Sequence, residues 1–416
     1  MKLYGVCIGL VLGWVIPLIA IAQVEESTIK PYFKIYPEFK VEDLGRPSRA
    51  GDVVGHLGTQ RNDTVVLSRD VAERAGVSEW SWSNSYVGLR GDHRTGAHRF
   101  GFDVQYEVDF QGEESALDNL RDNLLTRDAY LFYDNEAFGR VQVGKFDSIY
   151  KDWGDRYPML GLTSGNFIAN SRVLSQAGWR GAGSTSFNNR RNYSVLYVSP
   201  SLGPVKLGVM HSYDGGANDP GGPGTKLSAA GIRWDGKEHY AAFMVEQHTD
   251  WLPMSAGVSL PAATSIRNVA SQTSSKDVGY RLALGWSPKD FRVGFDLAQL
   301  NYRESGVATE VGRFSKYQNE TAQLTIQYLG IEKWRLAFNA TYANAGRCEL
   351  TGGAACSTQN LGGHQLSAGF LYSHNRLFSV FGLVTRLNNN PASRYGSVPQ
   401  GADAWIYAIG VKLEHR

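Results

Sequence analysis

The stretch Gly279–Leu297, GYRLALGWSPKDFRVGFDL, alternates apolar side chains with polar or small ones on both sides of a short turn. Its apolar positions are Tyr280, Leu282, Leu284, Trp286, Phe291, Val293, Phe295 and Leu297. Because successive side chains of a strand point to opposite faces, the pattern predicts a β-hairpin with one apolar face. In a soluble protein that face would meet a core, whereas in a membrane protein it would meet lipid.

The same alternation recurs along the chain and predicts sixteen strands. They lie near residues 30–41, 78–91, 96–111, 124–134, 138–147, 188–199, 203–213, 226–236, 238–247, 275–287, 290–302, 316–329, 333–345, 362–373, 377–388 and 402–414. Short connections such as Ser287–Lys289 alternate with long ones such as His248–Ser274. A soluble sandwich has no reason to keep every second connection short, but a transmembrane β-barrel does. We therefore predict an all-β, antiparallel barrel whose apolar stripe faces lipid and whose charges face a watery lumen.

Large aromatic residues stand at the ends of several predicted strands. Trp286, Trp334, Tyr342 and Trp405 occupy such positions. Aromatic side chains gather where a bilayer meets water, so these four are expected in interfacial girdles. For Trp286, and for Tyr407 on the last predicted strand, the alternative is plain packing of the barrel exterior at a subunit interface.

The chain begins MKLYGVCIGLVLGWVIPLIAIAQ, in which Ala20-Ile21-Ala22 follows an apolar run directly. This arrangement predicts a secretory signal peptide over residues 1–22, with a single membrane anchor as the alternative, and a barrel over 23–416. Without Lys2 the chain carries 41 Lys and Arg against 40 Asp and Glu. Such a balance argues against a nucleic-acid partner.

Two cysteines remain after the predicted signal peptide, Cys348 and Cys356, in RCELTGGAACS. In an exported protein a pair this close predicts a loop disulfide. A zinc site would need further Cys or His at close spacing, and none flanks the pair. The sequence contains no G-x-S-x-G, H-E-x-x-H or phosphate-binding loop, so we expect neither an enzyme nor a cofactor.

Several stretches resemble the general porins of Gram-negative outer membranes. They are VQYEVDFQG (104–112), GLRG (88–91), TRDAYLFY (126–133), FGRVQVGKFDSIY (138–150) and YSVLYVSPSLGPVKLGVMHSY (193–213). Their order and spacing carry the resemblance, which runs from about Pro31 to Tyr213 and weakens to strand patterning beyond. The resemblance implies a 16-stranded barrel, usually a homotrimer, whose third loop, here Asp147–Phe187, folds into the lumen and narrows it.

The resemblance also implies residues at the pore constriction. Carried over by position, they are the basic Lys34, Arg127, Lys145 and Arg191 and the acidic Glu107 and Asp155. Each could instead be a solvated lumen charge away from the narrowest point. Two departures stand out, because Tyr86 occupies the region of a second-strand arginine and Pro158–Gly161 reads PMLG in place of P-E-F-G-G. With one loop carboxylate missing, we expect a weak to moderate preference for anions.

Asp128 and Arg140 fall on the outward register of their predicted strands. A charge facing lipid is costly, so either the register slips there or these strands face a neighbouring subunit. We expect the subunit interface.

The expected function is an outer-membrane porin for passive diffusion of ions and small hydrophilic solutes. Its expected surroundings are outer-membrane lipid and lipopolysaccharide. One alternative is a substrate-selective channel of related build, although no regular series of lumen aromatics is evident beyond Tyr86, Tyr133 and Trp153. The other is a secreted all-β enzyme or carbohydrate-binding protein, which would be soluble without detergent.

Overall fold

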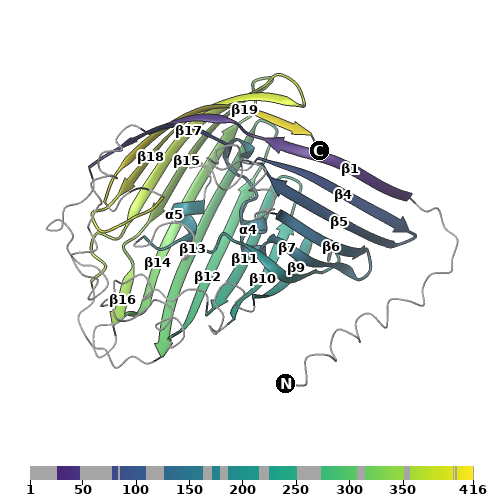
Figure 1. The fold of residues 1–416 in the computed structure, drawn as a ribbon, viewed down its shortest axis with the longest axis horizontal. Coiled ribbons are helices and arrows are strands. Elements are labelled where there is room, and N and C mark those ends of the chain that lie inside the picture. Colours follow the sequence, from purple (N-terminus) through teal and green to yellow (C-terminus); the bar gives the residue numbers. More distant parts are fainter. Residues whose placement is uncertain are drawn as a thin grey trace, which may run out of the picture.

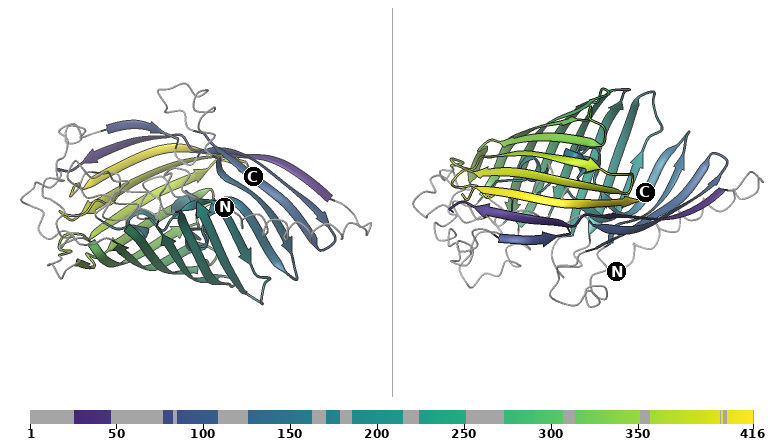
Figure 2. Two further views of the ribbon diagram at one scale, coloured as in Figure 1. Left: turned by 60° about the horizontal axis from the view of Figure 1, so that its bottom comes forward. Right: turned by 90° about the horizontal axis from the view of Figure 1, so that it is seen from above.

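A computed structural model describes residues 26–46, 77–82, 85–108, 126–162, 171–178, 186–214, 224–250, 273–306, 314–350, 357–396, 398 and 401–415. These residues form one antiparallel sheet that closes into a barrel (Figures 1 and 2). The strands are β1 (Glu26–Ile35), β2 (Glu38–Leu44), β3 (Val77–Ser81), β4 (Tyr86–Thr95), β5 (His98–Glu107), β6 (Thr126–Asn135), β7 (Gly139–Asp147), β8 (Arg190–Val198), β9 (Val205–Asp214), β10 (Thr225–Asp235), β11 (His239–Thr249), β12 (Thr273–Trp286), β13 (Phe291–Gly306), β14 (Phe314–Tyr328), β15 (Trp334–Ala343), β16 (Arg347–Leu350), β17 (Gly363–Ser373), β18 (Phe378–Asn389) and β19 (Ala404–His415).

Three pairs of these segments are halves of single barrel strands. β1 and β2 are separated by two residues at Pro37, where the chain leaves the ladder because proline cannot donate a backbone hydrogen bond. β3 with β4, and β15 with β16, are similarly interrupted. The described residues therefore form a barrel of sixteen strands, as the alternation predicts.

The barrel closes where its first and last strands meet. β1 pairs with β19 through Phe33–Ile35, and β2 continues the same edge of β19 as far as Leu44. Figure 1 shows β1 and β19 side by side near the C-terminus. Closure leaves the backbone groups of this seam paired, which a strand in a bilayer requires.

The predicted hairpin at Gly279–Leu297 is formed by β12 and β13. Tyr280, Leu284 and Trp286 are exposed on the outer face, whereas Arg281 and Ala283 are buried toward the lumen. The prediction that its apolar face points away from the barrel interior is confirmed.

A bulge corrects the expectation for Asp128. On β5 and β6, Val104 lies opposite Ala129 but Tyr106 lies opposite Thr126, so β6 carries an extra residue. An extra residue re-aims the side chains that follow it, and Asp128 lines the lumen. The predicted outward placement at a subunit interface was wrong, because register slips at the bulge.

Arg140 also faces the lumen. It lies opposite Asp134, and its guanidinium carbon is 4.1 Å from the centre of the Phe132 ring. Tyr130, Phe132 and Arg140 together line one cavity. For this residue too the predicted subunit contact was wrong.

The third loop folds into the lumen, as the resemblance implies. It carries α4 (Ile149–Gly154), the 3-10 helix η3 (Met159–Gly161) and α5 (Ser171–Ser175). Figure 1 shows α4 and α5 inside the barrel. Within the described ranges, no helix is long and apolar enough to cross a membrane.

Candidate functional site: the lumen and its third loop

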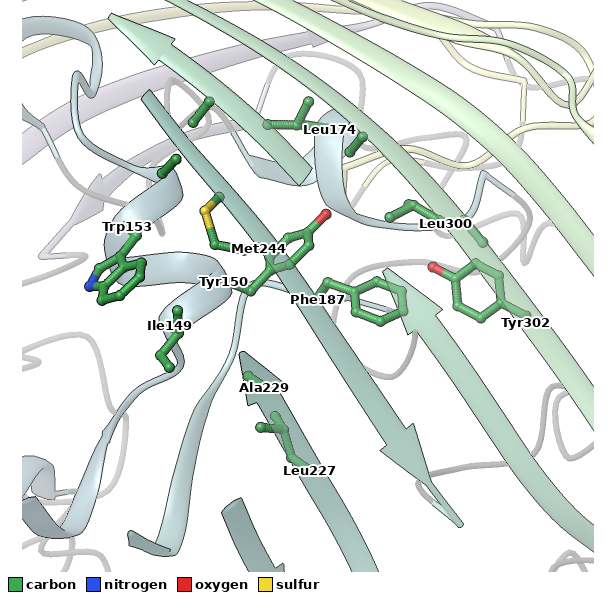
Figure 3. Packing of buried hydrophobic residues seen from close by; sticks show 14 of the residues in the cluster. Ile149, Tyr150, Trp153, Leu174, Phe187, Leu227, Ala229, Met244, Leu300 and Tyr302 are labelled. Atoms are coloured by element: carbon green, nitrogen blue, oxygen red, sulfur yellow. The ribbon is translucent and has the colours of Figure 1, made fainter. Parts of the chain in front are cut away.

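Glycines on the barrel wall create the space for α4. A Cβ atom on Gly208 of β9 would lie 2.7 Å from the Trp153 ring, and one on Gly231 of β10 would lie 3.0 Å from it. Figure 3 shows Ile149 and Trp153 of α4 near Ala229 of β10. Because these approaches leave no room for a side chain, the helix and this wall are matched in shape.

Arg281 of β12 fixes the end of the helix to the wall. Its Nε donates to Oδ1 of Asp296 at 2.9 Å, and its Nη1 donates to Oδ1 of Asp155 at 3.0 Å. The Arg281 side chain has no solvent exposure, so both carboxylates compensate a buried charge. The hydroxyl of Tyr240 adds a 2.6 Å hydrogen bond to the carbonyl of Trp153.

The resemblance assigns Asp155 to the constriction. In the structure its carboxylate lies 3.0 Å from Nη1 of Arg281. The sequence pattern marked Arg281 as lumen-facing but contained no sign of its partner, because Arg281 and Asp155 are 126 residues apart.

Later parts of the loop are also attached to the barrel. Gln327 Nε2 donates to the carbonyl of Pro158 at 3.2 Å, and Thr321 Oγ1 donates to that of Leu174 at 2.6 Å. At the end of the loop, the Phe187 ring stacks on His248 with centroids 4.6 Å apart. Strands β10–β14, which carry many of these contacts, are called the anchoring wall below.

The opposite part of the lumen, formed by β1 and β4–β7, is called the charged wall. Lys34 Nζ lies 4.6 Å from the Tyr36 ring centre and 5.9 Å from that of Tyr86. The Arg127 guanidinium carbon lies 5.0 Å from the Tyr86 ring centre, and Nη1 lies 4.0 Å from Oε1 of Glu107. Three predicted constriction residues, Lys34, Glu107 and Arg127, are therefore brought together around Tyr86, where cation–π attraction holds the two cations.

A second group of charges joins this wall to the loop. Arg190 Nε lies 2.5 Å from Oδ1 of Asp128, and Arg190 Nη2 lies 3.1 Å from Oδ1 of Asp147. Lys151 of α4 also contacts Asp147, at 3.0 Å. The network balances two cations with two anions across β6, β7, β8 and α4.

The sequence did not indicate Arg190 as a member of this charge network. The resemblance implied its neighbour Arg191 as a constriction residue instead. Arg191 Nη2 donates instead to Oγ1 of Thr225 at 2.7 Å. The β7–β8 register shifts between Gly144 and Phe146, so simple alternation could not tell which arginine reaches the network. Lys145, half-buried, lies at the same irregularity.

Two cavities adjoin the charged wall. One, of about 410 Å³, is lined by β1 and β4–β7, and the other, of about 810 Å³, extends from β6 to β10 beneath α4. Tyr130 and Arg140 line both cavities. The described part of the chain holds no group of three His, Cys, Asp or Glu side chains placed to bind a metal ion.

Asp152 of α4 lines the larger cavity. Its side chain meets lumen water although protein surrounds it on several sides. Desolvation raises the pKa of Asp152 to about 6, and repulsion from the Asp147 carboxylate adds to the shift.

Comparison with known proteins places this barrel in a family. The sequence model of a family described as Gram-negative porin matches residues 59–392. The chain belongs to the Gram-negative porin family. A search of curated protein sequences found no match.

Solved structures agree with this porin fold. The anion-selective porin from Comamonas acidovorans has a TM-score of 0.65 and 12% identity, over 94% of this chain and 100% of that chain. OmpT of Vibrio cholerae has a TM-score of 0.59 and 11% identity, over 95% and 100%. OmpF of Salmonella typhi, in complex with daunomycin, has a TM-score of 0.56 and 10% identity, over 93% and 97%.

The family, with the fold, identifies this porin as a channel of the bacterial outer membrane. The apolar outward face of β12–β13 is of the kind that transmembrane barrels turn to lipid.

Proposed function

We propose that this porin conducts ions and small hydrophilic solutes through a constriction between α4 and the charged wall. One observation carries the proposal: the third loop is attached to the anchoring wall, while the cavities adjoin the charged wall. We assign Lys34, Glu107 and Arg127 to this constriction because they meet around Tyr86 on the charged wall. Arg190, which joins that wall to the loop, is a fourth member. Lys145, Asp155 and Arg191 support it from its margins.

The charges of this constriction favour a weak to moderate preference for anions. Asp128 and Asp147 are neutralised by Arg190 and Lys151, and Asp155 is bound by Arg281. Arg127 is opposed by Glu107 at a longer distance, 4.0 Å. The similar structure from Comamonas acidovorans is that of an anion-selective porin, which agrees with this balance.

Reversal potentials in planar bilayers under a salt gradient test the proposal. Arg127→Ala should shift the reversal potential toward cation preference, and the shift should shrink at high salt because the Debye length falls from about 10 Å at 0.1 M to about 3 Å at 1 M. Arg303→Ala, an exposed residue of β13 away from the charged wall, is the control. An unchanged potential and conductance in Arg127→Ala would place the constriction elsewhere.

We further propose a homotrimer embedded in outer-membrane lipid and lipopolysaccharide. A trimer form of OmpT from Vibrio cholerae, with a TM-score of 0.59, supports the assembly. The mass of the detergent-solubilised protein tests it, and a monomer mass under conditions that preserve the folded barrel would contradict it.

Two proposals concern covalent processing. Residues 1–22 are proposed as a signal peptide and lie outside the described residues. Cys348 lies on β16, and Cys356 lies outside the described residues. We propose that they are bridged, so native mature protein should show two fewer thiols than reduced protein.

A further inference from the structure

Arginine and aromatic side chains are stacked along the smaller cavity of the charged wall. The Arg140 guanidinium carbon lies 4.1 Å from the Phe132 ring centre, and that of Arg99 lies 5.4 Å from it. Arg90 is placed similarly over Tyr32, at 5.1 Å. A Cβ atom on Gly101 would lie 2.4 Å from Phe132, so the glycine allows this ring to lie against the wall.

The cavity carries more positive than negative charge. Arg99 is paired with Asp92 at 3.0 Å, and Arg140 donates to the neutral side chain of Gln142. Among the described residues, neither Arg90 nor Lys30 has a carboxylate within 4.0 Å, and both line the cavity.

Asp103 is the other acid of this cavity. Its carboxylate accepts a hydrogen bond from the hydroxyl of Tyr32. Three cations, Lys30, Arg90 and Arg140, therefore face one carboxylate that is already hydrogen-bonded. The site is suited to a further anion.

We propose that this cavity is a binding subsite for aromatic carboxylates, a refinement that rests on the channel function proposed above. A guanidinium presents N–H groups to a carboxylate along its edge while its face remains available to an aromatic ring. A ligand ring could therefore pack beside Phe132 and Tyr130 while its carboxylate meets Arg90 and Lys30. The volume of about 410 Å³ lies within the range of small-molecule sites.

The position of the subsite gives it a consequence for conduction. Because Tyr130 and Arg140 also line the larger cavity beneath α4, a ligand here occupies the diffusion path. A bound aromatic acid should therefore compete with small anions for the same cations and reduce their current.

The test compares benzoate with cyclohexanecarboxylate, which has the same charge and a ring without π electrons. The concentration of each acid that halves the sodium chloride current is measured in planar bilayers containing the folded porin. Benzoate should act at a concentration about two- to fivefold lower, because one cation–π contact at an exposed site is worth that factor. Phe132→Leu and Arg140→Gln should each bring the ratio toward one.

Arg386→Gln is the matched control. Arg386 also stacks on an aromatic ring, with its guanidinium carbon 5.0 Å from the Trp405 ring centre, but this pair involves an exposed tryptophan far from the cavity. This variant should keep the wild-type ratio. Equal half-blocking concentrations in the wild-type channel, or an unchanged ratio in both cavity variants, would overturn the subsite. A protein that forms no channel in sodium chloride alone would instead overturn the proposed function.

Discussion

The anchoring wall and the charged wall face the same lumen but interact with it in different ways. On the anchoring wall, Gly231 admits the Trp153 ring, and Arg281 is fully buried between two carboxylates. On the charged wall, Arg90 and Glu107 remain exposed, and Arg90 lines a cavity. Lys34 and Arg127 of the same wall are buried beside the Tyr86 ring. One wall holds the loop in place, and the other leaves a path for solutes.

This difference shows that a lumen-facing charge can serve two purposes. A charge buried against the loop contributes to the position of the loop, because its desolvation must be compensated by partners. A charge that keeps its water contributes to the field felt by permeating ions. Burial in the folded protein, more than residue type, separates Arg281 from Arg90.

The largest expected effect is on the anchor of the loop. Arg281→Ala leaves Asp155 and Asp296 without their cation, and breaking a buried pair costs about 3–5 kcal/mol. We expect a lower unfolding temperature and a larger, noisier conductance, because the loop loses an attachment. Arg292→Ala, an exposed residue of the neighbouring strand β13, should leave both unchanged. Equal behaviour of the two variants would mean that Arg281 does not hold the loop.

A smaller effect is expected from filling the space beneath α4. Gly231→Leu places a side chain where the Trp153 ring lies, and overpacking costs about 1–3 kcal/mol. Thermal unfolding of the detergent-solubilised barrel should register the loss. The control is Ser201→Leu, in the exposed turn between β8 and β9. Gly203 in the same turn is unsuitable, because leucine would be strained at its backbone φ of 63°. Wild-type stability of Gly231→Leu would contradict the close packing of α4 on β10.

The smallest expected effect is a pH step in selectivity. The folded pKa of Asp152, about 6, is above its ordinary value of 3.8, so its carboxylate becomes neutral as pH falls through 6. Because folding raises the pKa of Asp152, its protonated form adds to the free energy of unfolding at low pH. This contribution is lost as pH rises through 6. Anion preference should increase between pH 7.5 and 5, and Asp152→Asn should remove this step. If Asp152→Asn showed an equal change of anion preference between pH 7.5 and 5, another titrating group would be responsible for that change.

Strand positions could be predicted from the sequence because a lipid-facing barrel repeats one alternation in every strand. The β12–β13 hairpin illustrates this, since its outward and inward residues follow the pattern throughout. Alternation failed at Asp128 and between Arg190 and Arg191, where bulges insert residues that no periodicity reveals.

The site could be predicted only in part. Lys34, Glu107 and Arg127, which the resemblance implies for the constriction, lie together around Tyr86, because each is positioned by its own strand. Their place at the narrowest point stays a prediction. Asp155 and Arg281 meet through a loop that crosses the lumen, and residue spacing contains no information about that path. Tyr133, named in the sequence as a possible lumen aromatic, lies on the outward face of β6 with Leu131, so that suggestion was wrong. Tyr130 and Phe132, which alternate with Tyr133, line the lumen cavity instead.

The central claim is that solutes pass along the charged wall while the anchoring wall is closed by the loop. A charge attached chemically to each wall tests this claim most directly. Glu107→Cys on β5 puts a thiol where the native side chain is 39% exposed, and Ala283→Cys on β12 puts one where the native residue is 3% exposed. A cationic thiol reagent is added to single channels, and the parent protein, which carries Cys348 and Cys356, is the control. We predict that the reagent shifts the reversal potential of Glu107→Cys toward anion preference and leaves Ala283→Cys unchanged. A shift of equal size in Ala283→Cys would show that the anchoring wall is open to solutes and would contradict the account.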